Sequence, residues 1–224
     1  MRSTSSSLPF ALLVTASSGF LDAYTYVAKG RVFANAQTGN VILCALDVAH
    51  LHWALASTRA YPILAFVVGI AFAMHVKIGR LDTVFSHPIR WTLLIQAAIL
   101  LAIGFIPPSW PYAASTIPIA FLASVQMELF RSIGDLNYMA IATTGNLMRL
   151  VEAGYRVLID RETGARRAFR TYGAVVGMFA GGAVVGAVVT EWLGGRAVWV
   201  PAAALVLSLV LFVIDERGEP DPAP

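Results

Sequence analysis

The stretch Gln37-Thr38-Gly39-Asn40 is the most informative part of this chain, because its last three residues occur again at Thr144-Gly145-Asn146. The two copies are 144 − 38 = 106 residues apart in a chain of 224 residues. Each copy follows one apolar run and opens another. Polar residues that loosen a helix, placed at matching positions of two apolar halves, are typical of a duplicated membrane protein whose binding site lies at these weak points.

The composition is that of a membrane protein. Hydrophobic residues make up 58% of the chain and charged residues 13%, whereas a soluble domain carries roughly 25% charged residues. The mean hydropathy is +0.71. The net charge of +3 is small, and the basic residues are clustered along the chain. This clustering is a guide to membrane topology and not a sign of nucleic-acid binding, so we expect no nucleic-acid partner. The lone Cys44 excludes an internal disulfide and a multi-cysteine metal site, and we expect no metal and no cofactor.

Six segments are long and apolar enough to cross roughly 30 Å of hydrocarbon. They are about 8–28, 60–78, 91–107, 111–130, 171–192 and 197–214. The N-terminus imitates a signal peptide, but its apolar run continues to Val27, so we expect a first transmembrane helix instead. We therefore predict an all-α integral membrane protein. Its first repeat is 1–107, its second repeat is 108–214, and 215–224 is a disordered cytoplasmic tail.

The distribution of Lys and Arg decides between two topologies. If six segments span and the Thr-Gly-Asn segments form broken or re-entrant helices, twelve basic residues lie on one side and four on the other. With eight spans the division is about nine to seven, and the repeats are parallel. The clearer asymmetry favours six spans with both termini in the cytoplasm. Three spans in each half then give the repeats opposite orientations, as in inverted repeats.

The two Thr-Gly-Asn motifs are candidates for a solute site. Glycine lets the backbone bend or approach a partner, and Thr and Asn side chains present oxygens to a ligand or to freed backbone groups. A helix that begins after a break points its positive dipole end at the site. The alternative is that each motif only caps a helix or packs two helices together. The residues we expect to bind solute are Gln37, Thr38, Gly39, Asn40, Gln126, Thr144, Gly145 and Asn146.

Asp22 and Glu128 are candidates for ion coupling, and they too are 128 − 22 = 106 residues apart. Burying a carboxylate in a membrane is costly, so such residues usually face a cavity or a partner and often serve ion or proton pathways. The competing interpretation is an acid at the interface, or a buried pair with Lys29, Arg31 or Arg131.

Two stretches resemble the YoaK family of bacterial membrane proteins. The first is Gly19–Ala23 followed by Val32–Asn40, and the second is Gln126 followed by Thr143–Leu147. The resemblance implies a multi-pass protein of the bacterial inner membrane and brings no assigned biochemical function. The chain departs from the family at Gln126-Met127-Glu128, where the family often has Gln-Asn.

The chain contains no Gly-x-Ser-x-Gly, Walker, His-Glu-x-x-His or dinucleotide-binding motif, and we expect no enzyme. The sequence predicts a small secondary transporter or permease for an unknown small solute, coupled to protons or cations and embedded in the lipid bilayer. The glycines of 171–192 leave room for a homodimer. The alternative is a non-transporting membrane scaffold or regulator that binds a partner protein or lipid. A cavity that reaches both motifs favours the transporter, and a packed centre favours the scaffold.

Overall fold

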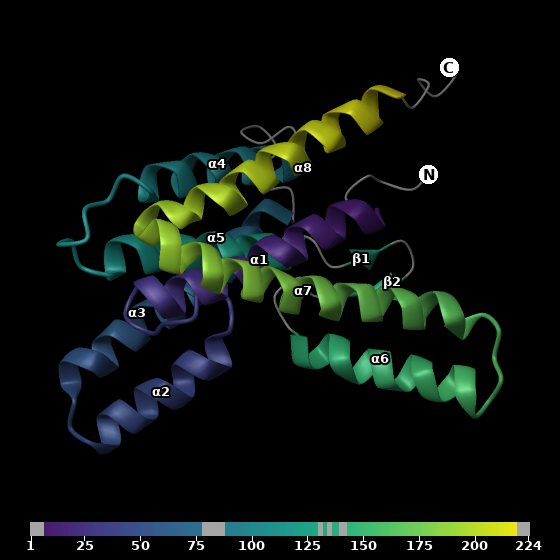
Figure 1. The fold of residues 1–224 in the computed structure, drawn as a ribbon, viewed down its shortest axis with the longest axis horizontal. Coiled ribbons are helices and arrows are strands. Elements are labelled where there is room, and N and C mark those ends of the chain that lie inside the picture. Colours follow the sequence, from purple (N-terminus) through teal and green to yellow (C-terminus); the bar gives the residue numbers. More distant parts are fainter. Residues whose placement is uncertain (1–6, 78–87, 130–131, 134–135, 139–142, 219–224) are drawn as a thin grey trace.

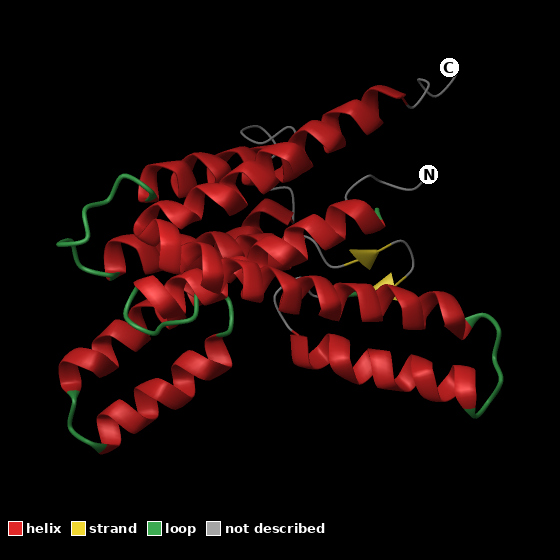
Figure 2. Cartoon of the chain, in the orientation of Figure 1, coloured by secondary structure: helices red, strands yellow, loops and turns green. Residues whose placement is uncertain are grey.

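The computed structural model describes residues 7–77, 88–129, 132–133, 136–138 and 143–218, and almost all of them are helical (Figures 1 and 2). The all-α class is therefore confirmed. The helices are α1 (Leu8–Ala28), α2 (Gln37–Ala49), α3 (Trp53–Lys77), α4 (Pro88–Ile103), α5 (Ala113–Leu129), α6 (Thr143–Leu158), α7 (Ala165–Leu193) and α8 (Trp199–Gly218). A short 3₁₀ segment, Gly194–Val198, joins α7 to α8.

A small hairpin between α5 and α6 is a feature that the sequence did not predict. Its strands β1 (Ser132–Ile133) and β2 (Leu136–Asn137) pair antiparallel, with Ser132 opposite Asn137. The hydroxyl of Tyr172 on α7 donates a hydrogen bond of 2.8 Å to the carbonyl oxygen of Asn137. This hydrogen bond attaches the hairpin to α7, the helix that packs against α1.

The six apolar segments all form helices, and α1 has the predicted bounds. The Thr-Gly-Asn motifs lie in the first turns of two additional helices, because Thr38 is the second residue of α2 and Thr144 the second residue of α6. They start short helices and do not interrupt long ones. At the C-terminus α8 continues to Gly218. Residues 215–218 of the expected tail are thus helical, and 219–224 lie outside the described residues.

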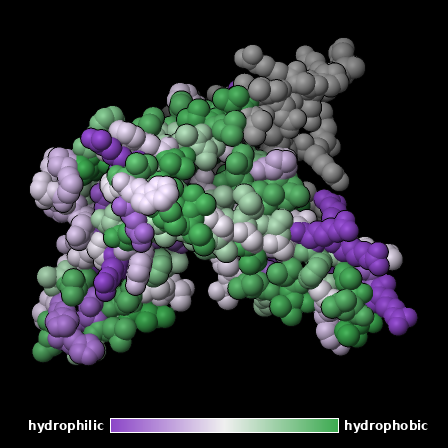
Figure 3. All heavy atoms as spheres, viewed as in Figure 1, coloured by the Kyte–Doolittle hydropathy of each residue, from purple (hydrophilic) through white to green (hydrophobic). Residues whose placement is uncertain are grey.

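Two helical stretches of the described chain, Trp53–Val76 and Ala165–Val210, are long and apolar enough to cross a membrane. The apolar helices Arg90–Ile103 and Ala113–Leu129 are shorter. Large apolar side chains cover much of the visible surface (Figure 3), and Val184 on α7 is 65% exposed. Extensive exposed apolar surface marks a region that meets lipid or another protein. The structure thus contains apolar helices suited to a membrane, while the six-span topology stays a prediction.

The helices pack in the same order in both halves of the chain. The most extensive interfaces join α1 to α7 and α3 to α5; α2 packs on α3, α6 packs on α7, and α4 packs on α8. Exchanging α1–α4 for α5–α8 leaves this set of pairs unchanged. In Figure 1 the hairpins α2–α3 and α6–α7 extend from the central helices with their turns pointing in opposite directions. The long helix α3 of the first half therefore packs on α5 of the second half, and the long helix α7 of the second half packs on α1 of the first. The short helices α2 and α6 each pack on the long helix that follows them.

The α1–α7 interface is close enough for backbones to touch. A Cβ on Gly19 would collide with the carbonyl oxygen of Phe179, and one on Gly182 with that of Ala16. Small residues at such crossings let helix backbones approach in this way. The packing fixes the position of α1, and with it the position of Asp22.

Candidate functional site

The linker 29–36 between α1 and α2 is held by a buried arginine. Gly30 and Arg31 both have positive φ, +80° and 56°, and this left-handed turn directs the chain back along α1. Arg59 of α3 donates hydrogen bonds to both of their carbonyl oxygens, at 2.7 Å for Gly30. Its Nε also lies 3.4 Å from the Asp47 carboxylate on α2. One side chain thus attaches the linker to the α2–α3 hairpin.

Asn40 holds the next part of the linker. Its Oδ1 accepts the Phe33 N–H at 2.9 Å, and its Nδ2 donates to the Phe33 carbonyl at 2.6 Å and to Gln37 Oε1 at 2.9 Å. Asn40 is fully buried, and its amide pairs with the Phe33 backbone much as a neighbouring strand would. The Phe33 ring covers Gly39, where a Cβ would lie 2.8 Å from ring atom Cδ2. Gly39 and Asn40 therefore shape the loop.

Asp22 anchors the last residues of the linker through only one of its two carboxylate oxygens. Its Oδ1 accepts the N–H groups of Asn35 at 2.7 Å and Ala36 at 3.4 Å. The Asn35 side chain in turn donates to the Ser18 carbonyl at 2.8 Å. The other carboxylate oxygen, Oδ2, is buried and has no hydrogen-bond partner among the described residues.

The sequence offered Lys29, Arg31 and Arg131 as alternative partners for Asp22, and the structure describes the first two. Asp22 forms no ion pair with any residue that the structure describes. Lys29 is buried at the end of α1, with its Nζ 5.8 Å from the centre of the Tyr24 ring, and this burial lowers the pKa of Lys29. Arg31 is exposed, and Arg131 lies outside the described residues. Within the described part of the chain, Asp22 is thus a buried acid whose Oδ2 has no partner.

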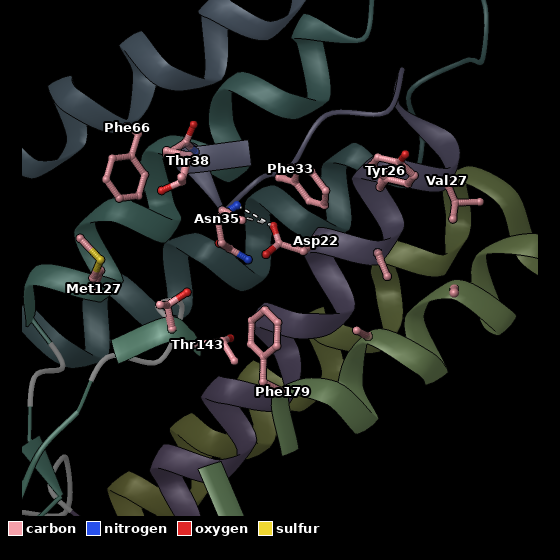
Figure 4. A pocket seen from close by; sticks show the side chains of 16 residues that line it. Asp22, Tyr26, Val27, Phe33, Asn35, Thr38, Phe66, Met127, Thr143 and Phe179 are labelled. Atoms are coloured by element: carbon pink, nitrogen blue, oxygen red, sulfur yellow. Dashed lines mark hydrogen bonds between the residues drawn. The ribbon is translucent and has the colours of Figure 1, made fainter. Parts of the chain in front are cut away.

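A cavity of about 700 Å³ lies beside this oxygen, between α1, the linker, α3, α7 and the first turns of α2 and α6 (Figure 4). Gln37 and Thr38 line it from the first motif, and Thr143 and Thr144 from the second. Asp22 is the one charged side chain among the described residues of the wall. The cavity therefore brings the two motifs together, although they are 106 residues apart in the sequence.

The other predicted site residues lie outside the cavity wall. Gln126 accepts a hydrogen bond of 3.1 Å from Gln96 of α4, and Asn146 and Glu128 are buried. At Gly145, an added Cβ would have only the end of the Arg149 side chain within 4 Å. Of the ten candidates, the structure places Asp22, Gln37, Thr38 and Thr144 on the wall and leaves off Gly39, Asn40, Gln126, Glu128, Gly145 and Asn146.

Four aromatic residues contribute to the rest of the wall, and the sequence interpretation did not select them. Tyr26, Phe33, Phe66 and Phe179 come from three helices and the linker. Aromatic residues inside apolar runs give no sequence signal that separates a cavity wall from a packed core. Thr143 had a weak signal, because it belongs to the stretch Thr143–Leu147 that carries the family resemblance.

The comparisons with known proteins give a family and no activity. A family model described as a protein of unknown function, DUF1275, matches residues 10–211, which is nearly the whole chain. Searches of curated proteins and of solved structures find no match. The match agrees with the expected uncharacterised family, and the YoaK name itself stays a prediction.

Proposed function

The chain belongs to the DUF1275 family, and we propose that it is a small membrane permease whose solute site is the cavity between α2 and α6. One observation carries the proposal. Thr38 from the first half and Thr143 and Thr144 from the second line the same cavity, beside a buried carboxylate oxygen of Asp22 that has no partner among the described residues. Polar groups that converge in a largely apolar cavity are the usual make-up of a small-molecule site. The proposal includes no catalytic step.

We propose that the two halves, 1–107 and 108–214, are inverted repeats in a bacterial inner membrane. The matched helix pairs support this arrangement. If the two-fold axis lies in the membrane plane, the α2–α3 and α6–α7 turns face opposite sides of the bilayer. The α6–α7 turn then lies on the side of the start of α1 and the end of α8, as in Figure 1. This side carries Arg161 to Arg170 and is cytoplasmic by the distribution of basic residues.

The length of α2 and the charges of α6 support the re-entrant part of this topology. With 13 residues, α2 extends about 20 Å, less than the roughly 30 Å of a hydrocarbon core. α6 is as long as α4, at 16 residues, but it carries Arg149, Glu152 and Arg156, which makes it a poor lipid-facing span. Each helix begins at the cavity and ends at a turn, as a half-helix does when it starts near the midplane. In α2 the N–H groups of Gln37, Gly39 and Asn40 already donate to the carbonyl oxygens of Asn35 and Ala36. We therefore assign the contact with solute to the threonine side chains of the two first turns and not to a row of free helix N–H groups.

The proposed transport cycle moves one half against the other around this site. The solute binds where the halves meet, so rocking along the α1–α7 and α3–α5 interfaces exposes the cavity to each side in turn. Asp22 couples the movement to an ion, because its free oxygen takes a proton or a cation in one state and releases it in the other. Glu128, its counterpart on α5, is buried outside the cavity wall and serves the same coupling indirectly.

The rival function, a non-transporting scaffold that binds a partner protein or lipid, requires a packed centre. The cavity that reaches both motifs favours the permease over this rival. A homodimer is compatible with either function.

Topology and transport are tested separately. In a Cys44→Ala background, the variants His50→Cys in the α2–α3 turn and Glu162→Cys in the α6–α7 turn are expected to react with impermeant maleimide from opposite sides of oriented vesicles. Labelling of both from the same side would contradict inverted repeats.

For transport, the protein in liposomes is screened for solute uptake driven by a pH gradient. We expect Asp22→Asn and Thr144→Val to reduce uptake. Glu191→Gln, which removes an exposed acid outside the cavity wall, is the matched control and should not. Uptake that is unchanged in the Asp22→Asn variant would contradict the proposed site.

A further inference from the structure

We infer that the ligand of the cavity is an organic cation: a molecule with an ammonium group and an apolar, ring-sized body. The inference deepens the proposed function, since it names the class of solute for the same site. It rests on the proposed function for transport, while ligand binding can be measured without transport.

The charge of the cavity supports an ammonium group. Asp22 is 5% exposed, and its Oδ2 has no hydrogen-bond partner among the described residues. Leaving a buried carboxylate oxygen without a partner is costly. Arg59, the buried cation of the α2–α3 hairpin, is occupied by Asp47 and by carbonyl oxygens of the linker. No cationic side chain is among the described residues of the wall, and an ammonium group of the ligand would supply the partner that Oδ2 lacks there.

The aromatic wall supports an organic cation over a metal ion. The rings of Phe33 and Phe179 flank Asp22 in the view of Figure 4, with Phe66 and Tyr26 further along the wall. Ring faces attract ammonium groups through their quadrupole, and the ring surfaces take up the apolar body of the ligand. Metal ions in proteins are usually held by several charged or imidazole ligands, and the described residues contain no group of three or more His, Cys, Asp or Glu side chains that could hold one. Asp22 is the only carboxylate of the described wall, whose other side-chain oxygens belong to neutral hydroxyl and amide groups.

The size of the cavity and a second polar group on its wall define the rest of the ligand. A volume of about 700 Å³ is in the range of small-molecule sites. At the start of α6 the Thr143 hydroxyl is buried without a hydrogen-bond partner in the described part of the chain. It is a candidate partner for a second polar group of the ligand. Both a primary amine and an amino acid carry the ammonium group. Only the amino acid also carries a carboxylate, which could accept a hydrogen bond from the Thr143 hydroxyl.

The test compares four probes that share a phenyl ring: phenethylamine, phenylalanine, phenylpropanol and hydrocinnamate. Binding to the full chain in lipid nanodiscs is measured by calorimetry, with empty nanodiscs as the blank. We expect phenethylamine to bind about tenfold or more tightly than the neutral phenylpropanol, as for a desolvated charge pair, and hydrocinnamate to bind most weakly. Tighter binding of phenylalanine than of phenethylamine would place a carboxylate at the start of α6 and support the ammonium site.

Two variants of the wall and one control make the test specific. Asp22→Asn keeps an oxygen for the Asn35 N–H, and we expect it to remove the preference for the amine while phenylpropanol binding is unchanged. Phe179→Leu provides a second variant if Asp22→Asn does not fold, and it should weaken the amine more than the alcohol. Glu191→Gln removes one exposed negative charge outside the wall and should leave all four affinities as they are.

Three results would overturn the inference. They are alcohol or anion binding to the wild type as tight as that of the amine, a preference for the amine over the alcohol that survives Asp22→Asn, and folded protein that binds radiolabelled sodium and none of the amines. The proposed function fails in a different way. Selective amine binding without uptake into liposomes would refute the permease and keep the ligand class. Uptake of a neutral solute by protein that binds no amine would refute the ligand class and keep the permease.

Discussion

Replacing Asn40 with alanine should destabilise the fold, because this side chain holds the loop that forms one wall of the cavity. The substitution removes all three hydrogen bonds of the side chain and leaves the N–H and the carbonyl of Phe33 without partners. Each unsatisfied backbone group costs about 1–3 kcal/mol, and part of that cost is recovered by water that enters the vacated space. The expected loss of unfolding free energy is therefore about 2–4 kcal/mol.

The assay is thermal unfolding in nanodiscs, followed by tryptophan fluorescence. For chains of about 150–250 residues each kcal/mol corresponds to about 2–4 °C, so the Tm of Asn40→Ala should fall by about 5–15 °C. Asn40→Asp retains an acceptor for the Phe33 N–H and offers no donor to the Phe33 carbonyl, so its Tm should also fall. Asn137→Ala, at an exposed asparagine that bonds through its backbone, is the control and should keep its Tm.

The same variants separate a structural role of Asn40 from contact with solute. If the Tm of Asn40→Ala equals that of the wild type while ligand binding is lost, Asn40 contacts the solute and the loop-holding role is refuted. If the Tm falls and the remaining folded protein binds with the original affinity, the sequence-based expectation of a direct contact is refuted.

Three further predictions concern backbone contacts. Gly182→Val should separate α1 from α7 and abolish a monodisperse elution profile, whereas Gly177→Ala, with nothing within 4 Å of its added Cβ, should raise the unfolding free energy by about 0.5–1 kcal/mol. Arg59→Gln should release the linker from the α2–α3 hairpin and accelerate tryptic cleavage within 29–36, measured by mass spectrometry; an unchanged rate would contradict the anchoring role. Gly39→Ala should lower the Tm because the Phe33 ring occupies the space, and Gly145→Ala should not, since only the flexible end of a side chain lies near it; equal effects in a melting assay would refute this difference between the motifs.

The course of the helices could be predicted from apolar runs, because helix length and hydropathy are local properties. Segment 8–28 became α1 with the predicted bounds. The sequence also singled out Asp22, Gln37, Thr38 and Thr144, which line the cavity, because polar groups in apolar surroundings are rare and have few explanations; their contact with a solute stays a prediction. The motifs predict broken or re-entrant helices, and the structure has a new helix that begins at each motif.

The rest of the site depended on packing between distant segments. Nothing local distinguishes Phe179, which lines the cavity, from an apolar residue of the core. Gln126 was expected to contact solute, yet its oxygen accepts a hydrogen bond from Gln96, 30 residues away in the chain. The small β1–β2 hairpin is two residues per strand, too short to produce an alternating pattern.

The repeated tripeptide has a division of roles that explains why both copies need the same residues. Thr38 and Thr144 each lie in the first turn of a short helix and line the cavity. Asn40 and Asn146, two residues later in each copy, are 0% and 1% exposed. A helix turns about 200° over two residues, so a threonine on the cavity side necessarily places its asparagine in the protein interior. We therefore expect a solute to be contacted at the threonines, whereas Asn40 acts through the loop that it holds at Phe33. Transport assays on asparagine variants accordingly require a stability measurement beside them.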